Sequence, residues 1–117
     1  MRTSVIAVAS LLATCLSAGA AEVGGKYEVR GTNANGSRYS GTATISKTGD
    51  YTCRIEWAVG SSSSGICMLA GDVFVAGYEL NGNVGLVVYE VRSDGTLDGR
   101  WTVADEDGFG TEILIPR

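Results

Sequence analysis

The sequence predicts an all-β protein built as a small antiparallel up-and-down barrel of eight strands. Apolar residues recur at every second position through most of residues 21–117, which is the period of a half-buried strand. Short segments rich in Gly, Asn and Asp interrupt this alternation, and the chain holds 17 glycines but a single proline. No helical stripe with capping residues is visible after residue 20. A flattened two-sheet β-sandwich is the alternative.

The first half of residues 21–117 predicts four strands separated by turn signals. In the first strand, Tyr27 and Val29 alternate with charged neighbours, and in the second Ala43 and Ile45 alternate with threonine and serine. The third strand carries Ile55 in the same phase as a cysteine and a tryptophan. These strands are expected at 25–31, 37–46, 51–59 and 65–70, with turns at 34–36, 47–50 and 60–64.

The second half predicts four more strands, at 72–80, 83–92, 96–104 and 109–115. Residues 73–75 and 84–88 are apolar on both faces, so they are either the best-covered strands or an exposed apolar patch. Eight consecutive antiparallel strands leave two free edges, and pairing the last strand with the first removes both. A barrel of eight strands is filled by its side chains or holds one small ligand.

The first 20 residues have the layout of a secretory signal peptide. A basic residue precedes an apolar stretch, and a small-residue ending reaches Ala20. Cleavage near Ala20 leaves a single domain, 21–117, in the periplasm or outside the cell. An alternative is a lipidated N-terminus at Cys15, because residues 12–15 look like a bacterial lipobox.

Cys53 and Cys67 are the two cysteines that remain after such a cleavage, and they predict a structural disulfide. A metal site needs further ligands, but the chain has no histidine and residues 21–117 hold no third cysteine. A redox-active pair is typically closer in sequence, as Cys-x-x-Cys. The bridge is expected between the third and fourth strands.

Charge and composition exclude several functions. Residues 21–117 carry eight basic and thirteen acidic side chains, a net charge of −5, which disfavours nucleic acid as a partner. No apolar run there is long enough for a membrane span. Without histidine, the serines Ser61–Ser64 have no base beside them. Carboxylate pairs could act as they do in glycosidases, but Asp94, Asp98 and 105–107 fall in or beside turns, where solvated charge is common. We therefore expect no enzyme, cofactor or metal, with weak calcium binding by 105–108 as the alternative to a solvated turn.

Aromatic residues are the candidate binding residues, and Tyr39, Trp57, Tyr78 and Trp101 are the ones selected. If they point inward, most of them form the core, and Trp57 and Trp101 line a small-molecule cup where the barrel is open at one mouth. Pointing outward, they mark a surface that binds protein.

Seven short motifs run along residues 25–112: Gly25-Lys26-Tyr27-x-Val29-x-Gly31-Thr32-Asn33, Gly36-Ser37-x-Tyr39-x-Gly41-Thr42, Cys53-x-x-x-Trp57, Ser64-Gly65-Ile66-Cys67, Gly85-Leu86-Val87-Val88-Tyr89, Asp94-Gly95-Thr96-Leu97-x-Gly99-x-Trp101 and Gly110-Thr111-Glu112. In these motifs the chain resembles a family of small exported alphaproteobacterial proteins, rhizobial and related, that are often labelled fibronectin-binding. The resemblance implies an adhesin-like role. The expected barrel is also similar to avidin-like and lipocalin-like ligand binders and to small periplasmic inhibitors of hydrolases.

Three functions follow from these observations. The first is a binding module for a protein or envelope component that acts through its surface or hairpin loops. The second is a small-molecule carrier that uses the barrel interior, and the third is an inhibitor of a hydrolase. A barrel filled without a cavity by Tyr39, Ile55, Trp57 and Trp101 would exclude the carrier.

Overall fold

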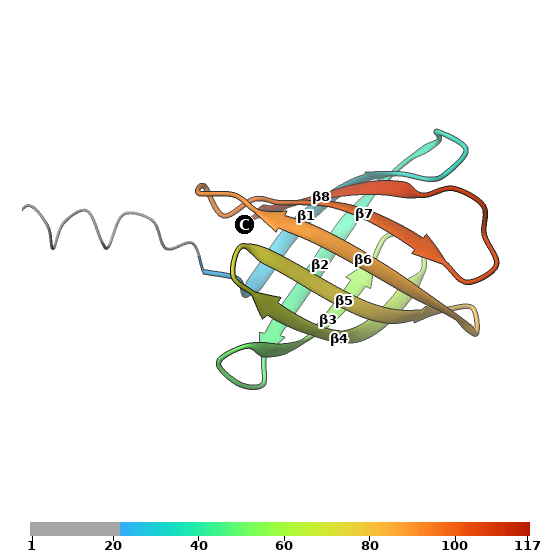
Figure 1. Cartoon of the computed structure of the whole chain (residues 1–117). Helices are drawn as coiled ribbons and strands as arrows, with labels where there is room; N and C mark the ends of the chain where they lie inside the picture. Colours follow the sequence, from blue (N-terminus) through green and yellow to red (C-terminus); the bar gives the residue numbers. More distant parts are fainter. Residues whose placement is uncertain (1–21) are drawn as a thin grey trace, which may run out of the picture.

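The computed structural model describes residues 22–117 as a closed antiparallel barrel, which confirms the predicted fold class and replaces the sandwich alternative (Figure 1). Each strand pairs with the next, and β8 pairs with β1 to close the sheet. The strands are β1 (Gly25–Thr32), β2 (Arg38–Lys47), β3 (Thr52–Ala58), β4 (Ser62–Ala70), β5 (Val73–Leu80), β6 (Asn83–Val91), β7 (Leu97–Val103) and β8 (Gly110–Pro116).

The expected signal peptide and Cys15 lie outside the described residues. Residues 22–117 contain no helix of the length and apolarity that a membrane span requires.

The strands follow the alternation of the sequence, because one face of the sheet lines the interior and the other meets water. In β3, for example, Cys53, Ile55 and Trp57 are buried and their neighbours are exposed. Each predicted strand end lies within one residue of the observed end, except at the start of β4.

The start of β4 is a correction to the sequence analysis, which expected a turn over residues 60–64. The pairing of Cys53 with Cys67 sets the register of β3 and β4, and the same register continues to Ala58 opposite Ser62. Only residues 59–61 are left for the turn, where the Val59 N–H donates to the carbonyl of Ser61 at 3.1 Å. The serines at 62–64 are therefore strand residues, which β-propensity alone does not favour.

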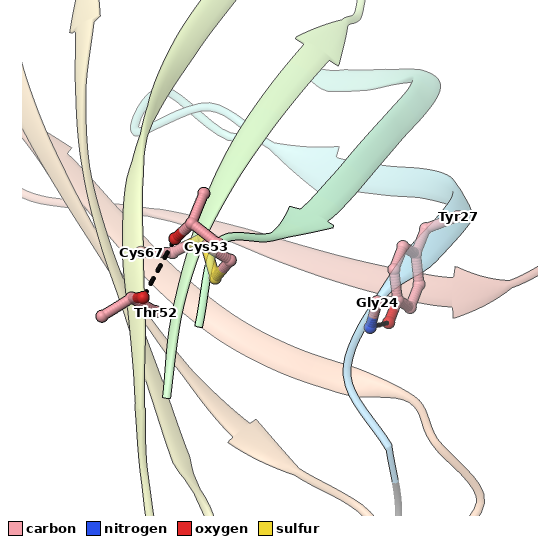
Figure 2. The surroundings of a disulfide bond; sticks show 6 residues. Gly24, Tyr27, Thr52, Cys53 and Cys67 are labelled. Atoms are coloured by element: carbon pink, nitrogen blue, oxygen red, sulfur yellow. Dashed lines mark hydrogen bonds between the residues drawn. A yellow bond between two sulfur atoms is a disulfide. The ribbon is translucent and has the colours of Figure 1, made fainter. Parts of the chain in front are cut away.

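One half of the barrel interior is packed solid. At the end where the chain enters β1, the hydroxyl of Tyr27 accepts a hydrogen bond from the backbone N–H of Gly24 at 2.8 Å, which ties the entering segment to a core side chain (Figure 2). The rings of Phe74 and Tyr89 contact each other with centroids 5.7 Å apart. The fully buried side chains of this half include Tyr27, Val29, Ile55, Phe74, Leu97 and Leu114.

The predicted disulfide is present within this solid half. Cys53 and Cys67 face each other directly across β3 and β4, with Cα atoms 4.9 Å apart, and both are buried (Figure 2). The bridge therefore joins two neighbouring strands from inside the barrel.

The outside of strands β4, β5 and β6 carries a contiguous apolar surface, here called the outer apolar face. The sequence left two possibilities for residues 73–75 and 84–88, well-covered strands or an exposed apolar patch, and the structure shows the exposed patch. Met68 lies beside Val75, and Val75 lies beside Val88 on the next strand. The face consists of Ile66, Met68, Val73, Val75, Val84, Leu86 and Val88, each between 36% and 68% exposed.

Replacing both cysteines, Cys53→Ala with Cys67→Ala, should lower the free energy of unfolding by about 3 kcal/mol. The bridge closes a loop of about fifteen residues, and its loss returns that loop entropy to the unfolded chain. Urea unfolding followed by circular dichroism measures the change. Reduced wild-type protein is the control, because it loses the bridge while keeping both sulfur atoms. Equal stability of oxidised and reduced wild type would contradict the prediction.

Candidate functional site at the open end of the barrel

The other half of the interior is hollow. A cavity of about 200 Å³ opens between the hairpins that join β1 to β2, β3 to β4 and β5 to β6, toward the right-hand end of the barrel in Figure 1. We call it the cup, and define it by Tyr39, Trp57, Ser63, Tyr78, Trp101 and Glu112.

All four aromatic residues selected from the sequence line this one cavity, and they come from four different strands. They form two edge-to-face pairs: the Trp57 and Tyr78 rings have centroids 5.2 Å apart, and the Tyr39 and Trp101 rings 6.2 Å. The condition that would exclude a carrier is therefore not met, because Ile55 is packed in the solid half and the other three line an open space.

Three of the four aromatic residues of the cup lie opposite a glycine, whereas Trp57 pairs with Ala43 and Ser63. Gly31 is the cross-strand partner of Tyr39, and a Cβ at Gly31 would come within 2.2 Å of the Tyr39 ring. Such a contact is far below van der Waals distance, so only glycine admits the ring there. The same pairing and the same conflict recur for Tyr78 with Gly85, Tyr89 with Gly99 and Trp101 with Gly110.

Glu112 lies at the inner end of the cup, and sequence analysis did not select it. It is only 5% exposed, and among residues 22–117 it is the single charged side chain that is buried. The available signal was its phase, because Glu112 alternates with Thr111 and Ile113 and shares the inward side of β8 with Leu114. An acidic residue in a strand is expected to face water, so the alternation alone does not predict that Glu112 points into the barrel.

Three neutral donors from three other strands hold the Glu112 carboxylate. The Tyr39 hydroxyl donates to Oε1 at 2.8 Å, and the Trp57 Nε1–H donates to Oε2 at 3.0 Å. The Tyr89 hydroxyl, which is completely buried, also donates to Oε2. These contacts meet the rule that a buried carboxylate needs hydrogen-bond donors, and no buried side-chain polar atom in the described chain lacks a partner.

Burial and the nearby carboxylate raise the pKa of the tyrosines around the cup. Burial raises the pKa of Tyr78 to about 12, with the negative charge of Glu112 adding to the effect. Burial first, and then Glu112, also raise the pKa values of Tyr39 and Tyr89 well above the ordinary value. All three hydroxyls therefore stay protonated at neutral pH and remain available as donors.

Glu112 is the only carboxylate among the residues that line the cup, and it accepts three hydrogen bonds. Ser61 and Ser63 also line the cavity. Within residues 22–117, no three His, Cys, Asp or Glu side chains gather closely enough to hold a metal ion.

Comparison with known proteins shows the fold. No protein-family model and no curated protein matches the chain. A redesigned β-barrel, mFAP1, bound to DFHBI is 15% identical with a TM-score of 0.66, and the match covers 78% of this chain and 93% of that barrel. A fluorescence-activating β-barrel designed de novo is 16% identical with a TM-score of 0.64, over 80% and 93%. A variant of the fluorescent protein UnaG is 14% identical with a TM-score of 0.50, over 80% and 94%.

Tyr89→Phe should lower the free energy of unfolding by about 1.5–3 kcal/mol, the range for a hydrogen bond to a charged group. The variant leaves the buried Glu112 carboxylate with one donor fewer. Tyr27→Phe is the matched control, because it removes a buried hydroxyl whose hydrogen bond is to a neutral backbone group, worth about 0.5–1.5 kcal/mol. Urea unfolding of both variants makes the comparison, and an equal loss would contradict a special role for the carboxylate.

Stability should fall with rising pH above about pH 10. The unfolded chain releases tyrosine protons there, while the folded chain keeps those of Tyr39, Tyr78 and Tyr89 because their pKa values are raised. The contribution of Tyr78 is complete below pH 10 and is lost as the pH passes through about 12.

Urea unfolding between about pH 8 and about pH 12 measures this dependence. Tyr78→Phe should make the decline shallower, and Tyr51→Phe, at an exposed position, is the control. A decline equally steep in Tyr78→Phe and wild type would contradict the assignment.

Proposed function

We propose that this protein is an exported, non-enzymatic binding protein that holds one small molecule in the cup. The observation that carries the proposal is the contrast between the two halves of the barrel. One half is filled by fully buried side chains, and the other keeps a cavity of about 200 Å³ with an aromatic wall and a single buried carboxylate. Small-molecule sites are typically concave, mostly apolar and equipped with a few convergent polar groups.

The wall of the cup is fixed before any ligand arrives. The Trp101 Nε1–H donates to the carbonyl of Thr111 at 3.3 Å, and the Tyr78 hydroxyl donates to the carbonyl of Thr102 at 3.2 Å. With Tyr39 and Trp57 bound to Glu112, each aromatic residue of the cup is held by its polar atom. Preorganisation of this kind favours binding, because less side-chain entropy is lost when a ligand enters.

The volume limits the ligand to a small compound or a small group of a larger one. The cavity of about 200 Å³ is smaller than the roughly 300–1,000 Å³ typical of sites for drug-sized ligands. A longer ligand would extend through the mouth past Asn33 and Leu80, which lie at its rim.

Structures of the same fold agree with interior binding in general terms. The redesigned barrel mFAP1 is bound to DFHBI, which supports the idea that an eight-stranded barrel of this shape can accept a ligand. At a sequence identity of 15%, the ligand of mFAP1 cannot be assigned to this chain.

The surface-binding role suggested by the sequence, including the adhesin-like role implied by the family resemblance, stays a prediction. The outer apolar face supports contact with another surface, since monomeric proteins rarely expose large apolar patches. Its aliphatic side chains offer no hydrogen-bonding or charge pattern that would select a partner. The cup offers both, and it is therefore the stronger basis for a function.

Intrinsic fluorescence tests the proposal directly. The chain has two tryptophans, Trp57 and Trp101, and both line the cup, so tryptophan emission reports on this site. Titration with a fragment library of cationic, neutral and anionic compounds should identify compounds that change the emission and saturate.

A matched pair of variants then locates the binding site. Ser63→Phe places a ring in the cup and should weaken binding at least tenfold, or about 1.4 kcal/mol. Ser64→Phe makes the same change at the next residue, which is exposed on the outside of β4, and should bind as wild type does. A library without binders, or binders unaffected by Ser63→Phe, would overturn the proposal.

A further inference from the structure

We infer that the ligand of the cup carries a positive charge, as a protonated or quaternary amine. This inference rests on the proposed function and names the chemical class that the site selects. Its basis is a buried carboxylate in an aromatic cavity with no cationic side chain of the described chain beside it.

The charge of Glu112 has no counter-ion within residues 22–117. All eight lysine and arginine side chains of this part of the chain are exposed on the outside of the barrel or in its loops. The ion pairs there, Arg30 with Glu28 and Arg92 with Asp98, are both exposed as well. Neutral donors stabilise the carboxylate, but they leave a net negative charge inside the barrel.

The carboxylate also retains room for a ligand. Its Oε2 accepts hydrogen bonds from Trp57 and Tyr89, whereas Oε1 accepts one from Tyr39 within standard geometry. An ionised carboxylate offers about four acceptor positions, so one remains, and Glu112 lines the cavity. An N–H of an amine can use this position directly, and a quaternary ammonium can approach it electrostatically.

The wall adds a second attraction for the same class of ligand. Tyr and Trp rings attract cations through their quadrupole, and the attraction is stronger where the pair is shielded from water. Four such residues surround the cavity: Tyr39, Trp57, Tyr78 and Trp101. Aromatic side chains combined with a carboxylate form the kind of cage that recognises ammonium groups.

Other ligand classes fit the cavity less well. An anion would be repelled by Glu112. A neutral or apolar ligand would bury the carboxylate further without placing an opposite charge beside it, which is unfavourable. A cation forms an ion pair with it.

The test compares a cation with its neutral isostere. Choline and 3,3-dimethyl-1-butanol have the same shape and differ in a quaternary nitrogen against a carbon. Titration of the wild-type protein, followed by tryptophan emission and by calorimetry, should show that choline binds at least tenfold more tightly. A trimethylammonium compound with an aromatic substituent and a primary alkylamine, each paired with its neutral analogue, extend the comparison.

Glu112→Gln is the informative variant, because it removes the charge and keeps the shape. It should bring the affinity ratio of each pair close to one. If Glu112→Gln does not fold, the affinity of each cation relative to its neutral analogue in the wild-type protein still tests the inference.

The outcomes separate this inference from the proposed function. Neutral analogues that bind as tightly as the cations, with binding lost in Ser63→Phe, would overturn the charge preference and leave the cup as a binding site. Cations that bind equally to wild type and Ser63→Phe would overturn both. Cations that fail to bind at millimolar concentration while other fragments occupy the cup would overturn the inference alone.

Discussion

The hydrogen bonds to the Glu112 carboxylate are the interaction around which the interior is organised. The acceptor comes from β8, and its donors come from β2, β3 and β6, so one side chain connects β8 to three strands with which it does not pair. Toward the solid half, Tyr89 packs among the fully buried side chains. Toward the open end, Tyr39 and Trp57 line the cup. The carboxylate thereby marks the boundary between the part of the barrel that supplies stability and the part that keeps space.

Space in so small a barrel depends on the strand register as much as on residue type. The interior of an eight-stranded barrel is just wide enough for side chains to fill it. A large ring therefore fits best opposite a cross-strand neighbour without a side chain, which is glycine. Register provides it by placing Gly31, Gly85, Gly99 and Gly110 each opposite an aromatic residue. The rings lie over glycine backbone, and the volume left beside them becomes the cup.

The sequence predicted the barrel and its strands because a period of two is a local signal, visible in pairs such as Tyr27 and Val29. The same period placed Tyr39, Trp57 and Trp101 on the inward phase, which is why these candidates meet in one cavity. Ser62–Ser64 were misplaced because the register of a cross-strand cysteine pair, and not local propensity, extends the hairpin. Glu112 was missed because its environment depends on three distant donors. The size of the cup depends on the glycine pairings, which only the folded register defines.

The positions of the disulfide and the cup have a consequence for how this protein can change over evolutionary time. The covalent bridge and the large buried side chains lie together at one end, and the hairpin loops that frame the cavity lie at the other. Substitutions and insertions in surface loops are tolerated far better than changes in a packed core. Related chains can therefore acquire new ligands through changes in the hairpin loops around the cup while they keep the disulfide and the packed core. Ligand preference would then diverge faster than the fold.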